Sequence, residues 1–235
     1  MLSGCFIIVM IILSRKQTEV WKSGETLWAR AIELYPAQET PRSLRGIYYS
    51  KKAKRTNNVK EKKLYEDKAF EDFKIAIKAG TPRADVYEGM GCICGSRGEY
   101  NNALLYFNKS IQMKPQKGSA YFNRAYTFSM LKRNEEAIID YNLALVYEPQ
   151  NALKILTNRY IIFLETGKFK EAIQDLDYLI SVDGNNFIFY FNRAQARAQL
   201  NDIQGAESDY KKVLIIQPDD QMTKTELQKL LKKSQ

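Results

Sequence analysis

Side chains that could carry out chemistry are scarce in this sequence, and histidine is absent. Its absence removes the commonest general base and metal ligand, and with them every Ser-His or Cys-His pair. The three cysteines are Cys5, Cys92 and Cys94. Cys92 and Cys94 lie two residues apart, so on a helix they point in different directions, and the three together fit neither a disulfide framework nor a zinc site. We expect Cys92 and Cys94 to be small packing residues.

The motifs that nucleotide, nucleophilic or metal chemistry requires are also missing. The sequence contains no Gly-rich phosphate loop, no nucleophile elbow and no cluster with metal-ligand spacing. It therefore predicts a protein that is not an enzyme, with no cofactor, no metal and no small-molecule substrate. One indirect link to catalysis stays open, which is an accessory domain whose chemistry lies on another polypeptide.

Positive charge is concentrated in one block. The chain has a formal net charge of +9, and the range 42–63 contains nine Lys or Arg and one acid, Glu61. Such a block indicates a local partner surface, either anionic lipid or an acidic protein, and the alternative is a solvated helical hairpin. The residues assigned to this basic tip are Lys51, Lys52, Lys54, Arg55, Lys60, Lys62 and Lys63.

The elements that must carry these residues repeat along the chain. Ala103, Ala137, Ala172 and Ala206 are separated by 34, 35 and 34 residues. The same spacings relate three further columns, which are Gly91, Ala125, Tyr160 and Ala194; Phe107, Tyr141, Leu176 and Tyr210; and Pro115, Pro149, Gly184 and Pro218. Small residues let two helices approach closely, and a proline ends the second helix of a pair. Four columns in one register therefore indicate a helical pair repeated four times.

These columns resemble the tetratricopeptide repeat, which has a small residue at the eighth place, Ala at the twentieth, an aromatic residue at the twenty-fourth and Pro at the thirty-second. The resemblance implies an all-α fold, a right-handed α-solenoid of helical pairs with an N-terminal apolar helix and a C-terminal capping helix. Gly98, Gly167 and Asn201 fall where the first helix of a pair must reverse. These residue types enter the left-handed region most readily.

The repeat register divides the chain into segments. Four full repeats are expected within 83–220, and their bounds are 83–117, 118–152, 153–186 and 187–220. An elongated pair at 39–82 precedes them, with Thr40 as N-cap and Pro41 at the first helical position. Its extra residues lengthen both helices by about five residues and project the basic tip about 8 Å. The outer segments are half a repeat at 19–38 and a capping helix at 221–235 with an apolar stripe of Met222, Leu227, Leu230 and Leu231.

An apolar run at residues 2–13 begins the chain, and Arg15 and Lys16 close it. As a helix it covers about 20 Å, less than the roughly 30 Å of a bilayer core. We expect residues 1–18 to form a single membrane anchor, shorter than a full span; the alternative is a helix docked on the solenoid, although the run is apolar all round.

A second resemblance covers residues 1–36, where the apolar run leads into Trp21, Trp28 and a Tyr35-Pro36 pair. This stretch is similar to the junction between the last transmembrane helix and the tetratricopeptide tail of polytopic membrane glycosyltransferase-like proteins. The resemblance implies an extracytoplasmic location for the repeats. Arg15 and Lys16 favour the cytoplasm instead, so the side of the membrane stays open.

The tetratricopeptide resemblance also implies a binding groove, lined by the second, fifth, ninth and twelfth places of each first helix. Aromatic and amide side chains at these and the sixth places suit an extended or helical peptide, and the alternative is that the rings pack between repeats. The family's clamp for chaperone tails needs Lys and Asn at the fifth and ninth places, which this chain lacks there. The groove residues assigned are Phe122, Asn123, Tyr126, Thr157, Asn158, Phe191, Asn192 and Gln195.

The combined prediction is a membrane-tethered scaffold that binds a protein or peptide ligand. One alternative is the C-terminal accessory tail of a membrane glycosyltransferase-like protein. A helical-repeat RNA-binding protein is disfavoured, because its basic charge should follow the groove, whereas here the groove places include Asp85 and Glu88. The expected partners therefore exclude nucleic acid, and no pattern indicates an oligomeric state.

Overall fold

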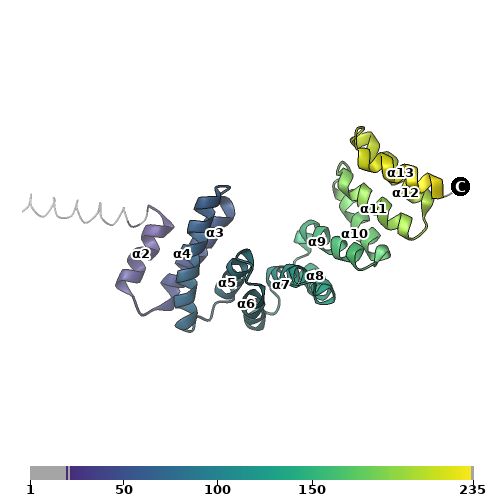
Figure 1. The fold of residues 1–235 in the computed structure, drawn as a ribbon. Helices are drawn as coiled ribbons and strands as arrows, with labels where there is room; N and C mark the ends of the chain where they lie inside the picture. The colour runs from purple at the N-terminus through teal and green to yellow at the C-terminus, as the bar shows by residue number, and fades with distance from the viewer. Residues whose placement is uncertain (1–19, 21, 234–235) are drawn as a thin grey trace, which may run out of the picture. The chain divides into compact units, whose positions relative to one another are not determined.

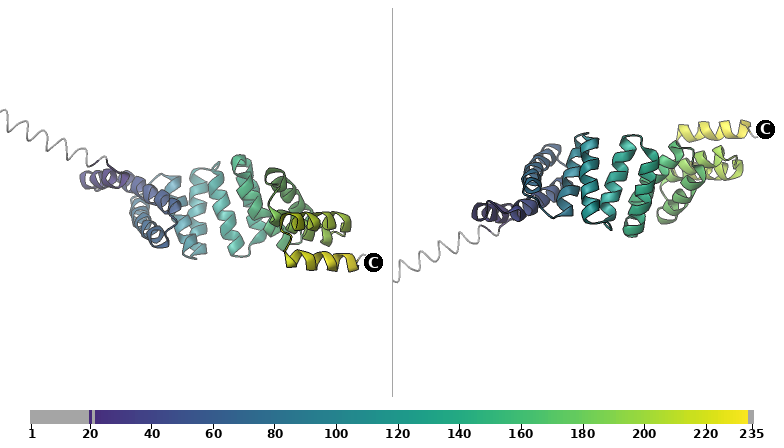
Figure 2. Two further views of the ribbon diagram at one scale, coloured as in Figure 1. Left: turned by 90° about the horizontal axis from the view of Figure 1, so that it is seen from above. Right: turned by 90° about the horizontal axis from the view of Figure 1, so that it is seen from below.

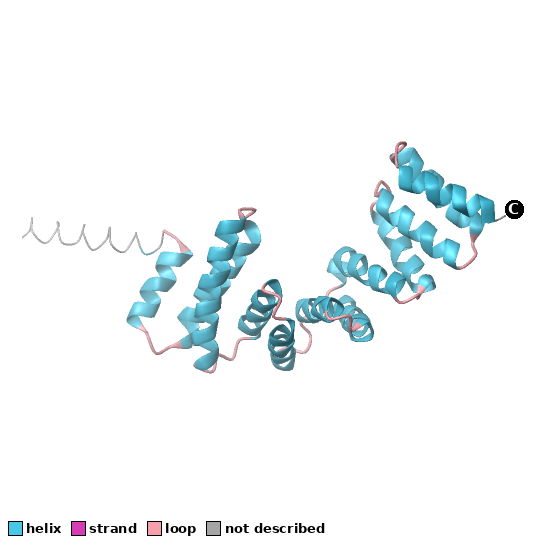
Figure 3. Cartoon of the chain, viewed as in Figure 1, coloured by secondary structure: helices cyan, strands magenta, loops and turns pink. Residues whose placement is uncertain are grey.

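The described part of the chain is entirely helical. A computed structural model describes residue 20 and residues 22–233, and within them twelve α-helices and one short 3₁₀ helix occur without any strand (Figures 1 and 3). The described residues form two compact units, which divide between residues 116 and 117. The first unit contains α2 (Gly24–Leu34), α3 (Glu39–Arg55), α4 (Val59–Lys78), α5 (Ala84–Ser96) and α6 (Tyr100–Met113).

The second unit continues the same pattern of helical pairs. It contains α7 (Gly118–Met130), α8 (Asn134–Tyr147), η1 (Pro149–Asn151), α9 (Ala152–Glu165), α10 (Phe169–Val182), α11 (Phe187–Gln199), α12 (Ile203–Ile216) and α13 (Gln221–Lys233). Within each unit the closest packing joins consecutive helices into hairpins, as Figure 2 shows from two further sides. The expected all-α class is therefore confirmed.

Small residues in the repeat columns allow the two helices of a hairpin to touch. Ala103, Ala137, Ala172 and Ala206 are completely buried. A Cβ atom added at Gly91 would lie 2.6 Å from the Phe107 ring, so the eighth place must be small where it faces a large twenty-fourth-place ring. The periodic columns are therefore the packing positions that the spacing predicts.

The reversal after each first helix uses left-handed backbone. Gly98, Gly167 and Asn201 have φ values of 77°, 70° and 62°, as their residue types predict. The corresponding place in the α7–α8 hairpin is Lys132, with φ of 58°. Glycine avoids the steric strain that a Cβ causes in this region, and the short polar side chain of Asn tolerates it. Lys132 has neither advantage, so it is the member of the column whose residue type fits least well.

Replacing Lys132 with glycine should stabilise the chain. The relief of left-handed strain outweighs the added entropy of an unfolded glycine by about 0.5–1 kcal/mol, and we expect the thermal midpoint to rise by about 1–4 °C. The exposed ion pair to Glu165, at 3.3 Å, adds little that could be lost. The mirror substitution Gly98→Ala should lower the midpoint, measured by circular dichroism; a lower midpoint for Lys132→Gly would contradict the assignment of strain.

The pair α3–α4 is longer than the pairs that follow it. These helices have 17 and 20 residues, whereas α5 to α12 have 13 or 14. The insertion therefore lengthens both helices, as the spacing predicts. The start signal was misplaced: α3 begins at Glu39, and the Thr40 hydroxyl donates to the Glu39 carboxylate at 2.9 Å instead of capping the helix. Pro41 is buried in the first turn, where its missing N–H costs nothing.

Single helices flank the hairpins at both described ends. At the first end, the Glu25 carboxylate on α2 accepts hydrogen bonds from the Tyr49 hydroxyl (2.8 Å) and from Lys68 (2.9 Å), which lowers the pKa of Glu25. At the other end, Leu227 and Leu230 of α13 pack on the core of α11–α12. Only part of the predicted stripe is buried, because Met222 is 62% exposed and Leu231 is 37% exposed.

Candidate functional site

A ladder of Arg–Asp pairs occupies the second unit. Arg124, Arg159 and Arg193 on the first helices each bind an aspartate sixteen residues later with two hydrogen bonds. The Nη2–Oδ1 distances are 2.7, 2.6 and 2.7 Å, to Asp140, Asp175 and Asp209. All three carboxylates are almost fully buried. This forked geometry is the strongest that an arginine makes with a carboxylate, so each pair fixes the two helices of its hairpin.

Arg159 and Arg193 also reach the preceding hairpin. Arg159 Nη1 donates to the Asn142 side-chain oxygen, and Arg193 Nη1 donates to Asp177, both at 2.6 Å. One guanidinium therefore joins three helices. The ladder links neighbouring repeats as well as the helices within each repeat.

The first unit contains one such pair and one apolar replacement. Arg45 binds Asp72 through distances of 2.7 and 2.8 Å. In the α5–α6 hairpin the same two places are Met90 and Tyr106, which pack in the hydrophobic core. The fold therefore accepts either a charged or an apolar pair at these places.

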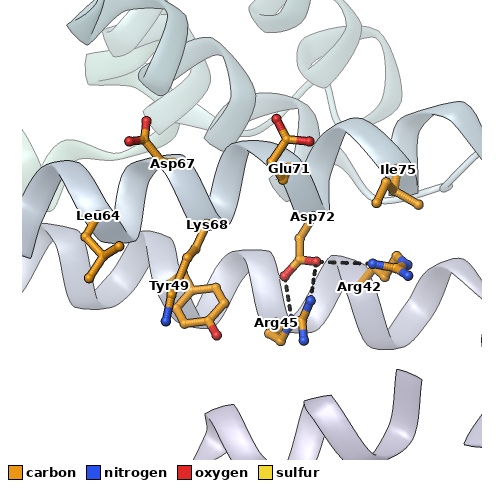
Figure 4. Close-up of a pocket in the computed structure, with 9 residues that line it drawn as sticks. All are labelled: Arg42, Arg45, Tyr49, Leu64, Asp67, Lys68, Glu71, Asp72 and Ile75. Atoms are coloured by element: carbon orange, nitrogen blue, oxygen red, sulfur yellow. Dashed lines mark hydrogen bonds and ion pairs between the residues drawn. The ribbon is translucent and has the colours of Figure 1, made fainter. Parts of the chain in front are cut away.

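A hollow of about 440 Å³ opens beside the Arg45–Asp72 pair on α3 and α4 (Figure 4). Figure 4 shows Arg42 and Arg45 converging on Asp72, with Lys68 beside the Tyr49 ring. Lys68 also pairs with Glu25, and Asp67 pairs with Arg97. Since these opposite charges already neutralise one another, we interpret the hollow as part of the hairpin's own stabilisation.

The predicted groove residues divide into packed rings and exposed polar positions. The rings of Phe122 and Phe191 are half-buried and meet Tyr141 and Tyr210 at centroid distances of 5.7 and 5.8 Å. The Lys154 ammonium lies over the Phe122 ring, 4.2 Å from its centroid. Phe122 and Phe191 therefore pack in part on the second helix of their own hairpin, and the half-exposed remainder of each ring leaves their predicted role in the groove a prediction.

The remaining groove positions lie in equivalent places on α7, α9 and α11. Tyr126 is 48% exposed, and the ninth place on α9 is Ile161, which is 44% exposed. The amides of Asn158 and Asn192 donate to the carbonyls of Lys154 and Ile188, both at 2.8 Å. Thr157 similarly donates to Leu153 within α9, and Asn123 is half-buried on α7.

Gln195, at the ninth place on α11, lines a second hollow of about 280 Å³. Side chains from five helices of the second unit surround it. The lining residues include Leu164, Phe169, Gln195, Gln199, Tyr210 and Glu226. The repeat spacing predicts that Gln195 lies in the groove. It does not predict that Glu226 of α13 lines the same hollow, because that depends on how the capping helix packs.

The basic tip surrounds the turn between α3 and α4. Its exposed members are Lys51, Lys54, Arg55, Lys60, Lys62 and Lys63. Lys52 differs, because its ammonium lies over the rings of Tyr48 and Tyr65 and is bonded to the Tyr65 hydroxyl at 3.3 Å. The missed member of this surface is Val59, which is 80% exposed at the first position of α4.

Tyr141 carries a buried hydroxyl that makes no hydrogen bond of good geometry within the described residues. The nearby Ser129 hydroxyl donates to the Tyr126 carbonyl instead. Burial raises the pKa of the Tyr141 hydroxyl well above its ordinary value. Phe107 fills the same column in the preceding hairpin, so the fold does not require an oxygen here.

The substitution Tyr141→Phe should therefore raise the free energy of unfolding by about 1 kcal/mol, because it removes an unsatisfied polar group and leaves the ring. Tyr160→Phe is the matched control, since the Tyr160 hydroxyl accepts a bond from Asn192 at 3.4 Å and should give no gain. Urea denaturation compares the two. A loss of stability in Tyr141→Phe would show that the hydroxyl has a partner.

Neither a metal-ligand cluster nor a membrane-spanning helix occurs in the part of the chain that the structure describes. Among the described residues, no group of three potential ligands could hold a metal ion. Within the same part of the chain, no helix is both long and apolar enough to span a bilayer. The predicted anchor at residues 1–18 lies outside the described residues.

Comparisons with known proteins match the repeats. Family models of the tetratricopeptide repeat match residues 84–117, 118–151 and 161–221, which together exceed half of the chain. The models begin at residue 84 and give no support to a glycosyltransferase junction at residues 1–36.

Two curated relatives and two solved structures illustrate the similarity. RNA polymerase II-associated protein 3 of Xenopus tropicalis is 32% identical over 52% of this chain and 18% of its own length. Tetratricopeptide repeat protein 16 of Homo sapiens is 26% identical over 80% of this chain and 22% of its own length. This chain thus spans about a fifth of either relative.

The structures establish likeness of fold. YrrB, described as a protein of this repeat type with an unusual peptide-binding site, has a TM-score of 0.69 and 18% identity, covering 86% of this chain and 97% of its own. MamA has a TM-score of 0.60 and 18% identity, covering 69% of this chain and 96% of its own. Both support the stacked helical pairs that the spacing predicts.

Proposed function

Because this chain belongs to the tetratricopeptide repeat family, we propose that it is a non-enzymatic scaffold that binds a peptide of a partner protein along α7, α9 and α11. The observation that carries the proposal is the column of positions at the same place in successive first helices. Tyr126, Ile161 and Gln195 occupy the ninth place, and Asn123, Asn158 and Asn192 occupy the sixth. Residues three apart on a helix are neighbours, so the two columns run side by side.

The chemistry of these columns suits a peptide backbone. Within the described residues, no donor is bound to the side-chain oxygens of Asn158 and Asn192, so both can accept a peptide N–H. Tyr126 and Ile161 add exposed apolar area for the ligand's side chains. This combination of amide acceptors and apolar surface provides both register and buried area.

Peptide selection with variants on opposite helices tests the proposal. A displayed library of random peptides is selected for binding to the full chain. The selected peptides are then titrated by calorimetry into the unmodified chain and into the variant Tyr126→Ser/Asn158→Ala/Gln195→Ala. We expect at least tenfold weaker binding, because exposed contacts are lost while the Phe122 and Phe191 packing is kept.

The control for this test is Ile139→Ser/Val146→Ser. These residues are exposed on α8, a second helix, and the substitution removes comparable apolar surface. Its affinity should equal that of the unmodified chain. Equal weakening in both variants, or none in either, would contradict a ligand site on the first helices.

A second candidate function is attachment to an anionic membrane. It rests on the exposed Val59 among six exposed basic side chains, since apolar and basic residues together favour the interface of an anionic bilayer. The apolar run at residues 2–13 would add a tether to the same unit. Binding through the basic tip requires anionic lipid, whereas insertion of the apolar run does not depend on lipid charge.

A further inference from the structure

We infer that the hollow beside α13 receives an arginine side chain of the bound peptide, an inference that rests on the proposed scaffold function. The hollow measures about 280 Å³, and the groove residue Gln195 forms part of its wall. A peptide crossing α11 at the ninth place would therefore pass over its opening. The inference therefore names one side chain of the peptide ligand, which the repeat positions of the groove residues do not identify.

The charge of the hollow selects a cation. Among the described residues that line it, Glu226 alone carries a charge. The Glu226 carboxylate lies close enough to Tyr210 to contribute, together with the larger effect of burial, to raising the pKa of that hydroxyl to about 12. A carboxylate in a partly enclosed hollow attracts a cation more strongly than one in open water.

The existing partner of Glu226 does not prevent this. Lys229 contacts Glu226 at 2.8 Å from the next turn of α13, but its side chain is 67% exposed. Such surface pairs contribute little, so a ligand cation can displace or share this contact. Among the residues that the structure describes, no donor is bound to the second carboxylate oxygen, which can therefore take part in a forked interaction.

The rest of the lining favours arginine. The ring of Phe169 and the side chain of Leu164 offer apolar walls for the methylene stem and for stacking of a guanidinium plane. Tyr210 is only 2% exposed and contributes a small part of the wall. The side-chain oxygens of Gln195 and Gln199 can accept its outer N–H groups. Arginine presents five donors in a plane, which matches one carboxylate and two amides better than the point charge of lysine does.

The inference is tested with single-residue probes on the full chain. Nα-acetyl-arginine amide and its neutral isostere Nα-acetyl-citrulline amide are titrated while backbone amide shifts are followed by nuclear magnetic resonance. The arginine probe should move the signals of Gln195, Gln199 and Glu226, with at least fivefold higher affinity than the citrulline probe. Equal affinities, or no shifts at these residues, would overturn the inference.

Variants separate the hollow from general attraction to acids. Glu226→Gln should reduce the affinity for the arginine probe at least fivefold, whereas Glu171→Gln, at an exposed acid of α10, should leave it unchanged. An equal loss in both variants would overturn the inference, because it would show non-specific attraction.

The selected peptides distinguish this inference from the scaffold proposal. If peptides bind the groove but carry no arginine at a fixed position and bind Glu226→Gln equally well, the hollow is not an arginine site and the scaffold proposal stands. If the library yields no binder while the arginine probe behaves as expected, the hollow is supported and the scaffold proposal fails.

Discussion

Removing the carboxylate of Asp175 is expected to lower the free energy of unfolding by about 3–5 kcal/mol. Asp175 is 4% exposed and holds Arg159 through distances of 2.9 and 2.6 Å. In Asp175→Ala the guanidinium, which is largely shielded from water, loses its countercharge while remaining in place. Urea denaturation followed by circular dichroism measures the loss.

A double substitution distinguishes pairing from simple packing. Arg159→Met/Asp175→Tyr copies the residues that the α5–α6 hairpin has at these places, Met90 and Tyr106. Because replacing a whole buried pair with apolar groups is often nearly neutral, we expect the double variant to recover most of the stability. A double variant as unstable as Asp175→Ala would contradict this explanation.

The exposed ion pair of Lys132 and Glu165 provides a control that tests whether burial sets the energetic cost of losing an ion pair. Its side chains are 74% and 44% exposed. Glu165→Ala should change stability by less than about 0.5 kcal/mol, since surface ion pairs are weak and screened. A loss comparable to that of Asp175→Ala would show that burial does not set the energetic difference.

Reversing three charges of the basic tip should weaken binding to anionic vesicles about 100-fold or more. Each basic residue near an anionic surface contributes about 1 kcal/mol, so Lys54→Glu/Lys60→Glu/Lys63→Glu removes at least three such contributions. Sedimentation of the full chain with phosphatidylserine-containing vesicles measures the change. Binding of the unmodified chain should also decrease with added salt.

A variant of identical net charge controls for overall electrostatics. Lys109→Glu/Lys114→Glu/Lys170→Glu changes three exposed lysines away from the tip. It should keep most of the binding, and an equal loss would show that total charge, not the tip, is responsible. Vesicles of phosphatidylcholine alone report on the apolar run at 2–13, whose insertion does not need lipid charge.

The helical pairs could be predicted because their determinants are local or strictly periodic. The alanine column marks where two helices touch, and Gly98, Gly167 and Asn201 mark the reversals. The Arg–Asp ladder was missed although its signal was available: Arg124, Arg159 and Arg193 follow the same spacings of 35 and 34 as the other columns. Charged residues are ordinarily assigned to the surface, so a periodic charge was not interpreted as a packing position.

The candidate site was less predictable because exposure depends on the neighbouring helix. Phe122 and Tyr126 are both aromatic and lie on the same helix, but the first meets the Tyr141 ring while the second remains half exposed. Lys52 was assigned to the tip by its place in a lysine-rich block, yet two tyrosines hold it. Such differences arise from tertiary contacts that a repeat register does not contain.

The bonds from Arg159 to Asn142 and from Arg193 to Asp177 also define how the chain can be divided. A fragment that begins at α9 or α11 keeps an arginine but leaves behind one of its partners. A fragment that ends after α8 or α10 leaves Asn142 or Asp177 without its arginine. The natural module for transplantation or truncation is therefore larger than one helical pair. A border placed before α5 divides no such arginine from its partners, because the ladder place on α5 is Met90.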